Sequence, residues 1–435
     1  MKVTVVGAGL AGSQAALYLA KQGIDVDLFE MRPEFSTGAH KTDKPAELVC
    51  SNSLGAFDKT VASGLLKHEL KILGSDLIEE AFKHSVPAGN ALAVDREGFS
   101  EKIKHLILDE PRINYVKKRI DKIPQNGVTI IASGPLTHPE LANDIKNFTG
   151  EDHLRFYDAV APIVEKSSIN FDKAFFKNRY DKGTPDYINC PMNKDEYLNF
   201  YEILTTSPKI QLKDFEKDAA FFESCLPVEV IASRGVDTLR FGPLKPVGLV
   251  DPRTGIENYA VVQLRQDDKI ADMYNLVGFQ TNLVWGAQKN LIRSIPGLEN
   301  AQILRYGVMH ANIFINSPKI LNPTLQTRKN PDLFFAGQIT GTEGYTESIA
   351  SGLMAGINAA RRIQGKELLT LPEITMAGAL FNYISFEGHK KFMPVNSNWG
   401  IIDKTGIDRK ILKNKKIKAE FMANRSLEYL KNLEV

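Results

Sequence analysis

Cysteine is scarce in this sequence. The 435 residues include three cysteines, Cys50, Cys190 and Cys225. An odd number of widely spaced cysteines argues against a disulfide framework and fits a reducing compartment, so we expect a cytoplasmic protein. No cysteine pair has Cys-x-x-Cys spacing and no histidine pair has His-x-x-x-His spacing. The sequence therefore predicts no metal site.

Long apolar runs are also missing. No uncharged apolar run approaches the roughly 18 residues that a membrane-spanning helix needs. The apolar run at residues 3–6 stops at glycines, with no site typical of signal-peptide cleavage. We therefore expect neither a membrane span nor a signal peptide.

Neither sign of charge is in large excess. The sequence has 54 lysines and arginines against 52 aspartates and glutamates, a net charge of +2. This charge is too small to indicate a nucleic-acid-binding protein, so any RNA binding must come from a local patch. Basic clusters occur at residues 117–119 and 409–418, and we expect both to be solvated faces.

The sequence does contain a complete βαβ opening. Residues 3–6 predict a buried strand, residues 13–20 a helix, and residues 24–30 a second strand that ends in an acid. Between them, Gly7 permits a tight turn, Gly9 lets the backbone approach a pyrophosphate, and Gly12 lets helix and strand pack closely. Glu30 follows where a ribose hydroxyl needs an acceptor. The predicted dinucleotide-binding residues are Gly7, Ala8, Gly9, Leu10, Ala11, Gly12 and Glu30.

Two later strands favour FAD over NAD. Residues 128–135 predict a strand that ends in small residues, including Gly134, and residues 333–338 predict another, ending in Gly337 and Gln338. Gly341 and Tyr345 follow, and then a helix over residues 347–362. In a simple NAD dehydrogenase the catalytic domain would follow the nucleotide-binding domain, and the chain would not need to return to that first domain. We predict an α/β protein with a Rossmann-like FAD-binding domain, residues 1–140 and 321–435, and an inserted mixed α/β substrate domain, residues 141–320.

Two of the cysteines lie in polar segments. Cys50 begins Cys-Ser-Asn-Ser, and Cys225 lies in Glu-Ser-Cys-Leu-Pro. Cysteines kept for packing are more typical of apolar runs, whereas reactive thiols need access and a stabilised thiolate. This setting suggests a flavoprotein that uses thiols, and we expect Cys190 to be structural.

Several longer motifs resemble one known family. They are residues 87–96, 238–249, 306–310, 314–318 and 335–341. Together they are similar to the folate- and FAD-dependent tRNA (uracil-5-)-methyltransferases, from residue 1 to about residue 400. The flavoproteins that modify wobble uridine look similar around the FAD segments, but they continue into a long helical C-terminal domain.

The resemblance implies an activity and its participants. A one-carbon unit passes from methylenetetrahydrofolate to carbon 5 of a T-loop uridine in tRNA, with FAD as cofactor and NADPH or NADH as reductant. The chemistry fits two thiols, because uracil carbon 5 becomes nucleophilic when a thiolate adds to carbon 6, and its proton must later be removed. The resemblance assigns the nucleophile to Cys225 and the base to Cys50. It implies no membrane and no obligatory protein partner.

Three positions depart from the family pattern. Gly55 and Ala311 stand where the family usually has arginine, and Asn282 stands where it usually has histidine. Arginine is the preferred planar partner for phosphate, so these changes would alter which RNA is bound. A uridine of large-subunit ribosomal RNA is therefore the alternative substrate. A plain NAD(P)H-dependent FAD oxidoreductase acting on a small molecule is a further alternative.

The roles of five other residues stay open at this point. Arg240 and Lys245 could face a phosphate, a folate tail or solvent. His310 could hydrogen-bond the flavin or a base, or be simply a satisfied polar group. Tyr345 could stack on the flavin or on folate, or be an ordinary core tyrosine. Glu343 is expected to order the cofactor loop rather than act as an acid or base.

Overall fold

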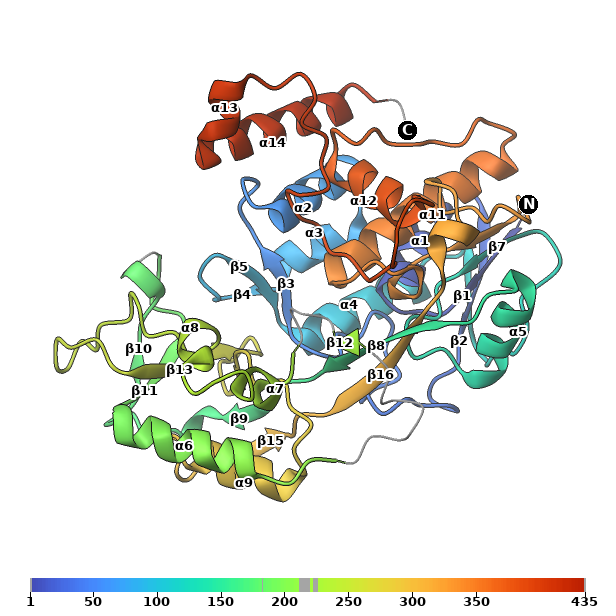
Figure 1. The fold of residues 1–435 in the computed structure, drawn as a ribbon. Helices are drawn as coiled ribbons and strands as arrows, with labels where there is room; N and C mark the ends of the chain where they lie inside the picture. The colour runs from blue at the N-terminus through green and yellow to red at the C-terminus, as the bar shows by residue number, and fades with distance from the viewer. Residues whose placement is uncertain (1, 182, 211–219, 222–225, 434–435) are drawn as a thin grey trace.

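A five-stranded parallel sheet organises the N- and C-terminal parts of the chain (Figure 1). This computed structural model describes residues 2–181, 183–210, 220–221 and 226–433, and at residues 157–159, 220–221, 310–311 and 409 it describes the backbone alone. The strand order is β17-β7-β1-β2-β6. The strands are β1 (Lys2–Val6), β2 (Asp25–Glu30), β6 (Ile113–Lys117), β7 (Val128–Ile131) and β17 (Leu333–Phe335). A parallel order with crossover connections is typical of a doubly wound α/β fold.

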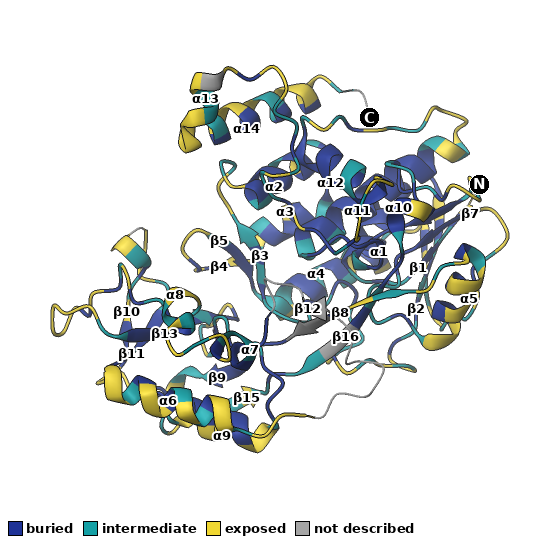
Figure 2. Ribbon diagram, viewed as in Figure 1, coloured by how far each residue is buried: buried dark blue, intermediate teal, exposed yellow. Residues whose placement is uncertain are grey.

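The helices α1 (Leu10–Lys21) and α11 (Tyr345–Ile363) pack closely against each other and both begin at the carboxyl edge of the sheet. Small residues permit this packing, since a Cβ added to Gly352 would lie 2.1 Å from the carbonyl oxygen of Ala11. Figure 2 shows the sheet and both helices as the buried centre of this half. The other helices around it are α2 (Ala62–Ile72), α3 (Asp76–Lys83), α4 (Arg96–Leu108), α5 (Pro139–Thr149), α10 (Ser317–Ile320) and α12 (Met376–Ser385).

A small antiparallel sheet and the C-terminal helices complete this half. The small sheet has the order β3 (Ser53–Ala56), β5 (Ala91–Val94) and β4 (Ser85–Val86). The last helices are α13 (Arg409–Lys413) and α14 (Lys415–Lys431). The buried carboxylate of Glu69 on α2 accepts hydrogen bonds from Met376 N, Ala377 N and the Ser426 hydroxyl. One side chain therefore joins α2, α12 and α14.

A second, antiparallel sheet forms the middle of the chain and has its own apolar core. Its order is β10 (Phe175–Phe176), β11 (Ile188–Met192), β13 (Ala260–Gln266), β14 (Met273–Leu276), β9 (Ile163–Glu165) and β15 (Ile303–Arg305). Four helices accompany it, α6 (Lys194–Thr206), α7 (Val228–Ala232), α8 (Thr238–Phe241) and α9 (Trp285–Arg293). Tyr197, Phe200 and Phe279 are fully buried there.

A short sheet connects the two halves. The chain leaves the first half along β8 (Leu154–Ala159) and returns along β16 (Met309–Phe314), which pairs antiparallel with β8, while β12 (Ala220–Phe221) pairs parallel with β8. Phe156 and Phe314 belong to the core of the first half. The predicted α/β class is confirmed, with strands β7 and β17 shorter than expected. The boundaries at residues 140 and 320 stay predictions.

No helix in the part of the chain that the structure describes combines the length and apolar content needed to cross a bilayer.

Candidate active site

A cavity lies at the carboxyl edge of the parallel sheet, beyond the ends of β1, β2 and β7. Ligands of open α/β sheets bind at this edge. Predicted cofactor residues from four separate segments line it, namely Gly7, Gly9, Leu10, Ala11, Glu30, Gly134, Gly337, Gln338 and Tyr345. The fold thus brings together residues that lie more than 300 positions apart in the sequence.

Three predicted cofactor residues support the cavity without lining it. Ala8 donates its N–H to Glu30 Oε2 at 3.1 Å. A Cβ on Gly12 would lie 1.8 Å from the carbonyl oxygen of Gly7, so helix and turn touch there as expected. Gly341 has φ +83°, accepts a hydrogen bond from Val395 N at 2.9 Å, and leaves no room for a Cβ beside the ring of Phe392.

The cavity fits FAD. A Cβ added to Gly9 or to Gly134 would meet no atom within 4 Å, so open space lies above both glycines. Gly9 is the N-cap of α1 and supplies no capping side chain, which leaves the amino end of this helix for a pyrophosphate. Gly7, with φ +101°, makes the tight turn before it. Gly9, Leu10 and Ala11 would hold the pyrophosphate, and Glu30 the ribose.

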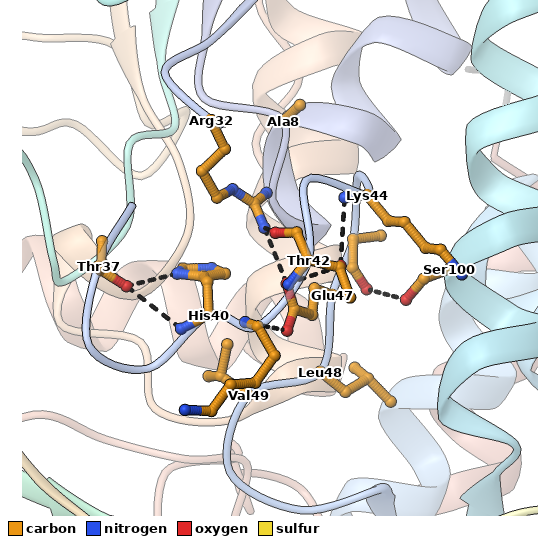
Figure 3. A network of polar contacts seen from close by, with 12 residues as sticks. Ala8, Arg32, Thr37, His40, Thr42, Lys44, Glu47, Leu48, Val49 and Ser100 are labelled. Atoms are coloured by element: carbon orange, nitrogen blue, oxygen red, sulfur yellow. Dashed lines mark hydrogen bonds and ion pairs between the residues drawn. The ribbon is translucent and has the colours of Figure 1, made fainter. Parts of the chain in front are cut away.

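Glu30 is held by an arginine that the sequence analysis did not identify. Arg32 donates to Glu30 through its backbone N–H and its Nε at 3.0 Å each. Its Nη1 donates to Glu47 at 3.0 Å (Figure 3). All three side chains are buried. Burial alone would raise the pKa of Glu30, but the hydrogen bonds and charge of Arg32 outweigh burial and lower it.

Glu47 holds the segment between β2 and Cys50 in place by hydrogen bonds. Its carboxylate accepts from Lys41 N at 2.8 Å and from the N–H and hydroxyl of Thr42 at 3.1 and 3.0 Å (Figure 3). Ala46 N donates to Ala8 O at 2.9 Å, which ties this segment to the glycine-rich turn. The route from the dinucleotide motif to Cys50 is therefore fixed by buried polar contacts.

Cys50 lies at the end of this segment, beside Tyr345. The Tyr345 hydroxyl accepts hydrogen bonds from the backbone N–H of Cys50 at 2.7 Å and of Ser51 at 3.2 Å. Burial raises the pKa of Tyr345 well above its ordinary value, and the neighbouring Cys50 raises it further. Tyr345 is therefore a neutral phenol whose hydroxyl positions Cys50, and ring stacking on a flavin or folate stays a prediction.

Two arginines flank the same segment. Arg96 donates to Leu48 O, and Arg305 donates to Val49 O at 2.5 Å. Burial lowers the pKa of Arg305 and the field of Arg96 lowers it further, whereas the charge and hydrogen bonds of Asp267 outweigh burial and raise the pKa of Arg96. Both guanidinium groups interact with Cys50, and positive charge near a thiol favours the thiolate.

A polar network joins the Cys50 segment to the second half of the molecule. Asn52, which is fully buried, donates to Val94 O at 3.1 Å and to Gln266 O at 2.9 Å. Asn275 donates to Asp267 at 3.0 Å, and Asp267 pairs with Arg96 at 2.9 Å. The position of Cys50 is thus set by both halves.

Lys67 is buried under the loop that follows Cys50. Its ammonium donates to Ala56 O at 3.0 Å and to Ser63 O at 2.9 Å, and burial lowers its pKa to about 8, while nearby Glu347 opposes this shift. Gly55, with φ +84°, passes beside it, and a Cβ there would lie 3.7 Å from Lys67 Nζ. Gly55, one of the positions that depart from the family pattern, therefore lies in a left-handed turn that packs against the buried ammonium of Lys67.

Cys225 lies outside the described residues, but the segment that follows it is described. The buried carboxylate of Glu229 on α7 accepts from the Thr281 hydroxyl at 2.9 Å and from Asn282 N at 2.7 Å. Val228 N donates to Gln280 O at 2.7 Å. Asn282, the second departure, donates its side-chain amide to Ile210 O at 3.0 Å.

Other predicted residues have clear places. Cys190 is fully buried and burial raises its pKa, as expected of a structural cysteine. Arg240 donates to Tyr259 O and to Asp237 and lies 3.5 Å over the Tyr259 ring, so it is structural. Glu343 accepts from Gln338 at 2.6 Å and orders the cofactor loop as expected.

The last predicted positions are Lys245, His310 and Ala311. Lys245 is half-buried, and its backbone oxygen accepts from Arg179. The side chains of His310 and Ala311 are not among those described.

The two basic clusters differ from each other. Lys410, Lys413, Lys415 and Lys416 are exposed, as expected of a solvated face. The expectation is wrong for Arg119, which lines the cofactor cavity, pairs with Asp121 and lies 3.9 Å over the Phe35 ring. Among the described residues, no group of three or more histidines, cysteines or acids could hold a metal ion.

Comparison with known proteins identifies the family. The family of glucose inhibited division protein A, GIDA, matches residues 2–367. A methylenetetrahydrofolate–tRNA-(uracil-5-)-methyltransferase TrmFO from Bacillus cereus (strain G9842) is 55% identical over 430 residues, which cover 99% of this chain and 98% of that protein. The chain belongs to the TrmFO family. A TrmFO of Bacillus mycoides (strain KBAB4) is 54% identical with the same coverage.

Solved structures agree on the fold of this TrmFO family member. Aquifex aeolicus GidA, in its form II crystal, aligns with a TM-score of 0.71 and 18% identity over 100% of this chain and 74% of that one. The form I crystal aligns with a TM-score of 0.69. At this identity the likeness concerns the fold, and it confirms the predicted Rossmann-like arrangement.

The structure adds residues around the site of this TrmFO family member whose contacts the sequence patterns did not predict. They are Arg32, Glu47, Lys67, Arg96, Arg305 and Asn52. A buried lysine in a leucine-rich helix, as at Lys67 after Leu65 and Leu66, was one available signal. Arg96 and Arg305 carry no local signal for their contacts with the Cys50 segment, which lie 48 and 256 positions away, whereas Arg32 stands only two residues after its partner Glu30.

Proposed function

We propose that this protein methylates carbon 5 of a uridine in tRNA, with methylenetetrahydrofolate as the carbon donor, FAD as the resident cofactor and NADPH or NADH as the reductant. Membership of the TrmFO family over nearly the whole chain supports this function. The observation that carries it structurally is that Tyr345 lines the cofactor cavity while its hydroxyl holds Cys50. A thiol and a cofactor site therefore meet at one residue.

The chemistry requires a nucleophile and a base. Uracil carbon 5 attacks an electrophilic carbon only after a nucleophile has added to carbon 6, and a thiolate suits this reversible addition. We assign the addition to Cys225 and removal of the carbon-5 proton to Cys50. When bound, FAD supplies the electrons that bring the transferred carbon from the methylene to the methyl level.

The described residues around Cys50 support its role. Tyr345 fixes the backbone of Cys50, and Arg96 and Arg305 hold the two preceding carbonyl groups. The Cys50 thiol must be a thiolate before it can accept a proton, and the positive charges of Arg96 and Arg305, which both interact with Cys50, support that form. The buried network through Asn52 keeps the thiol in one position during the reaction.

A two-RNA assay tests the proposal. The purified protein is incubated with methylenetetrahydrofolate, NADPH and either tRNA lacking T-loop modification or unmodified ribosomal RNA, and nucleosides are quantified by mass spectrometry. We expect 5-methyluridine in the tRNA. Formation in the ribosomal RNA alone would replace the tRNA assignment by the ribosomal alternative, which Gly55, Asn282 and Ala311 motivate. NADPH turnover that needs neither RNA nor folate would favour the small-molecule oxidoreductase.

Thiol variants test the residue assignments. Cys225→Ala is expected to abolish methylation and the covalent adduct with 5-fluorouridine RNA, and Cys50→Ala to abolish methylation. Cys190→Ala is the matched control, since Cys190 is a buried packing thiol. Normal methylation by Cys225→Ala would refute the nucleophile assignment. The cytoplasmic location and the absence of an obligatory protein partner stay predictions.

A further inference from the structure

A second cavity, separate from the cofactor site, carries a concentration of positive charge. It has a volume of about 500 Å³ and lies where the start of β8, the end of β16 with α10, and the loop after α12 meet. Its cationic lining residues are Arg155, Lys319, Lys390 and Lys391. We call it the basic pocket.

Acidic groups balance only part of this charge. Glu387 is the one carboxylate among the described lining residues, and it pairs with Arg328 at 3.1 Å. Lys319 pairs with Glu151 at 2.9 Å. Lys390 and Lys391 are both exposed at the rim. The pocket therefore presents net positive charge to solvent, although the whole chain is nearly neutral.

The floor of the basic pocket is aromatic and rigid. The rings of Phe314 and Phe392 pack edge to face with centroids 5.8 Å apart, and the ring of His389 lies 5.7 Å from Phe392. His389 Nε2 contacts Tyr383 O at 2.7 Å, which fixes its ring. Phe314 and Phe392 are themselves buried, so the floor offers a packed support, and the cations at the rim are the groups that match the phosphates of a nucleic-acid strand.

The basic pocket is joined to the active site through one segment. Phe392 packs against Gly341, Val395 N donates to Gly341 O at 2.9 Å, and Glu343 N donates to Val395 O at 2.8 Å. The cofactor loop that these contacts hold runs directly into α11, whose first residue, Tyr345, positions Cys50. The segment that lines the basic pocket is therefore packed on the loop that leads to Tyr345 and Cys50.

We propose that the basic pocket binds phosphodiester groups of the RNA substrate outside the methylated loop. This inference rests on the proposed function, because it places part of the same RNA. Such contacts contribute affinity and orientation but carry no base readout. The phosphates of NADPH share this chemistry, and the experiment below distinguishes the two sources.

The test compares two charge-matched double variants. Lys390→Gln/Lys391→Gln removes two rim charges. Lys21→Gln/Lys366→Gln removes two exposed charges, one at the last residue of α1 and one three residues after α11 ends, on the side of both helices away from the cofactor edge. The dissociation constant for fluorescently labelled tRNA is measured by anisotropy at several salt concentrations. The KM for NADPH is measured by its oxidation without RNA.

We expect the rim variant to bind tRNA about tenfold more weakly, with the slope of log affinity against log salt reduced by about 1 to 2, and the control pair to match the wild type. Unchanged affinity and slope would overturn the inference. So would a raised KM for NADPH with unchanged tRNA binding, which would assign the pocket to the dinucleotide. A rim variant that binds tRNA as the wild type does would refute the role of the basic pocket alone. A wild type that binds neither tRNA nor ribosomal RNA would refute the proposed function as well. The two failures are therefore distinguishable.

Discussion

The hydroxyl oxygen of Tyr345 lies 2.7 Å from the backbone nitrogen of Cys50, although 295 positions separate the two residues in the sequence. The first residue of α11 therefore holds the thiol at the end of the segment that begins at the dinucleotide motif. One phenol belongs at once to the cofactor cavity and to the thiol site.

Tyr345→Phe tests this link. The backbone N–H groups of Cys50 and Ser51 would lose their acceptor, so we expect about 1–3 kcal/mol less stability and methylation about 10- to 100-fold slower. Thermal unfolding and single-turnover methylation measure the two effects. Tyr201→Phe, which removes a phenol bonded to Ala232 O in the second half, is the control. Equal methylation rates in both variants would show that the contact does not position the thiol.

Two glycine substitutions in the dinucleotide motif should have different effects, one on stability and the other on flavin binding. Gly12→Ala places a Cβ 1.8 Å from Gly7 O, so we expect at least about 3 kcal/mol of destabilisation. Gly9→Ala meets no protein atom within 4 Å, so the protein should fold but bind flavin at least tenfold more weakly. Urea unfolding and flavin absorbance per protein measure these outcomes. Full flavin content in Gly9→Ala would place the cofactor elsewhere.

Arg32→Met leaves two buried carboxylates, Glu30 and Glu47, without their cation. Removing one partner of a buried ion pair costs about 3–5 kcal/mol, so we expect a loss of that size together with loss of bound FAD. The comparison is Arg112→Met, whose ion pair with Asp25 is exposed and should matter by less than about 0.5 kcal/mol. Similar unfolding midpoints for both variants would contradict the prediction.

Glu69 predicts a pH dependence of stability. Burial raises its pKa to about 7, against hydrogen bonds from Ser426, Met376 and Ala377. Between about pH 4.5 and 7 the folded protein holds a proton that the unfolded chain has released, so this contribution is full below pH 4.5 and is lost as the pH rises through 7. The change is about 3 kcal/mol.

Urea unfolding at pH 5, 6, 7 and 8 measures the effect of Glu69. Glu69→Gln should remove this component of the slope, and Glu420→Gln, an exposed acid on α14, should leave the slope as in the wild type. A wild-type stability that rises from pH 5 to 7 in parallel with Glu69→Gln would show that the carboxylate stays charged.

The dinucleotide motif was predictable because its signals are local. Strand, turn, helix and acid all lie within residues 3–30, and the structure puts Gly7, Gly9 and Glu30 in the cavity. The return at Gly337 was predictable from a second short motif. Local patterns carry this information because each one fixes its own backbone.

The environment of Cys50 was not predictable in the same way. Arg96 and Arg305 contact the residues before Cys50 across 48 and 256 positions, and no spacing rule links them. The hydrogen bonds of the Tyr345 hydroxyl to Cys50 and Ser51 were not predictable for a related reason, since they join residues 295 and 294 positions apart. From the sequence, Arg119 belonged to a basic cluster that was expected to be solvated. Its packing on the Phe35 ring is a tertiary contact, which the local sequence does not reveal.

The antiparallel pairing of β8 with β16 brings together the two points at which the chain enters and leaves its middle part. Ala159 and Met309 face each other directly, so a short reverse turn could replace everything between them. The residues that line the cofactor cavity all lie outside that interval. Such a miniature would keep the residues that line the cofactor cavity, but it would lose Cys225 together with Gln266, Asp267 and Arg305, whose contacts help to hold the Cys50 segment.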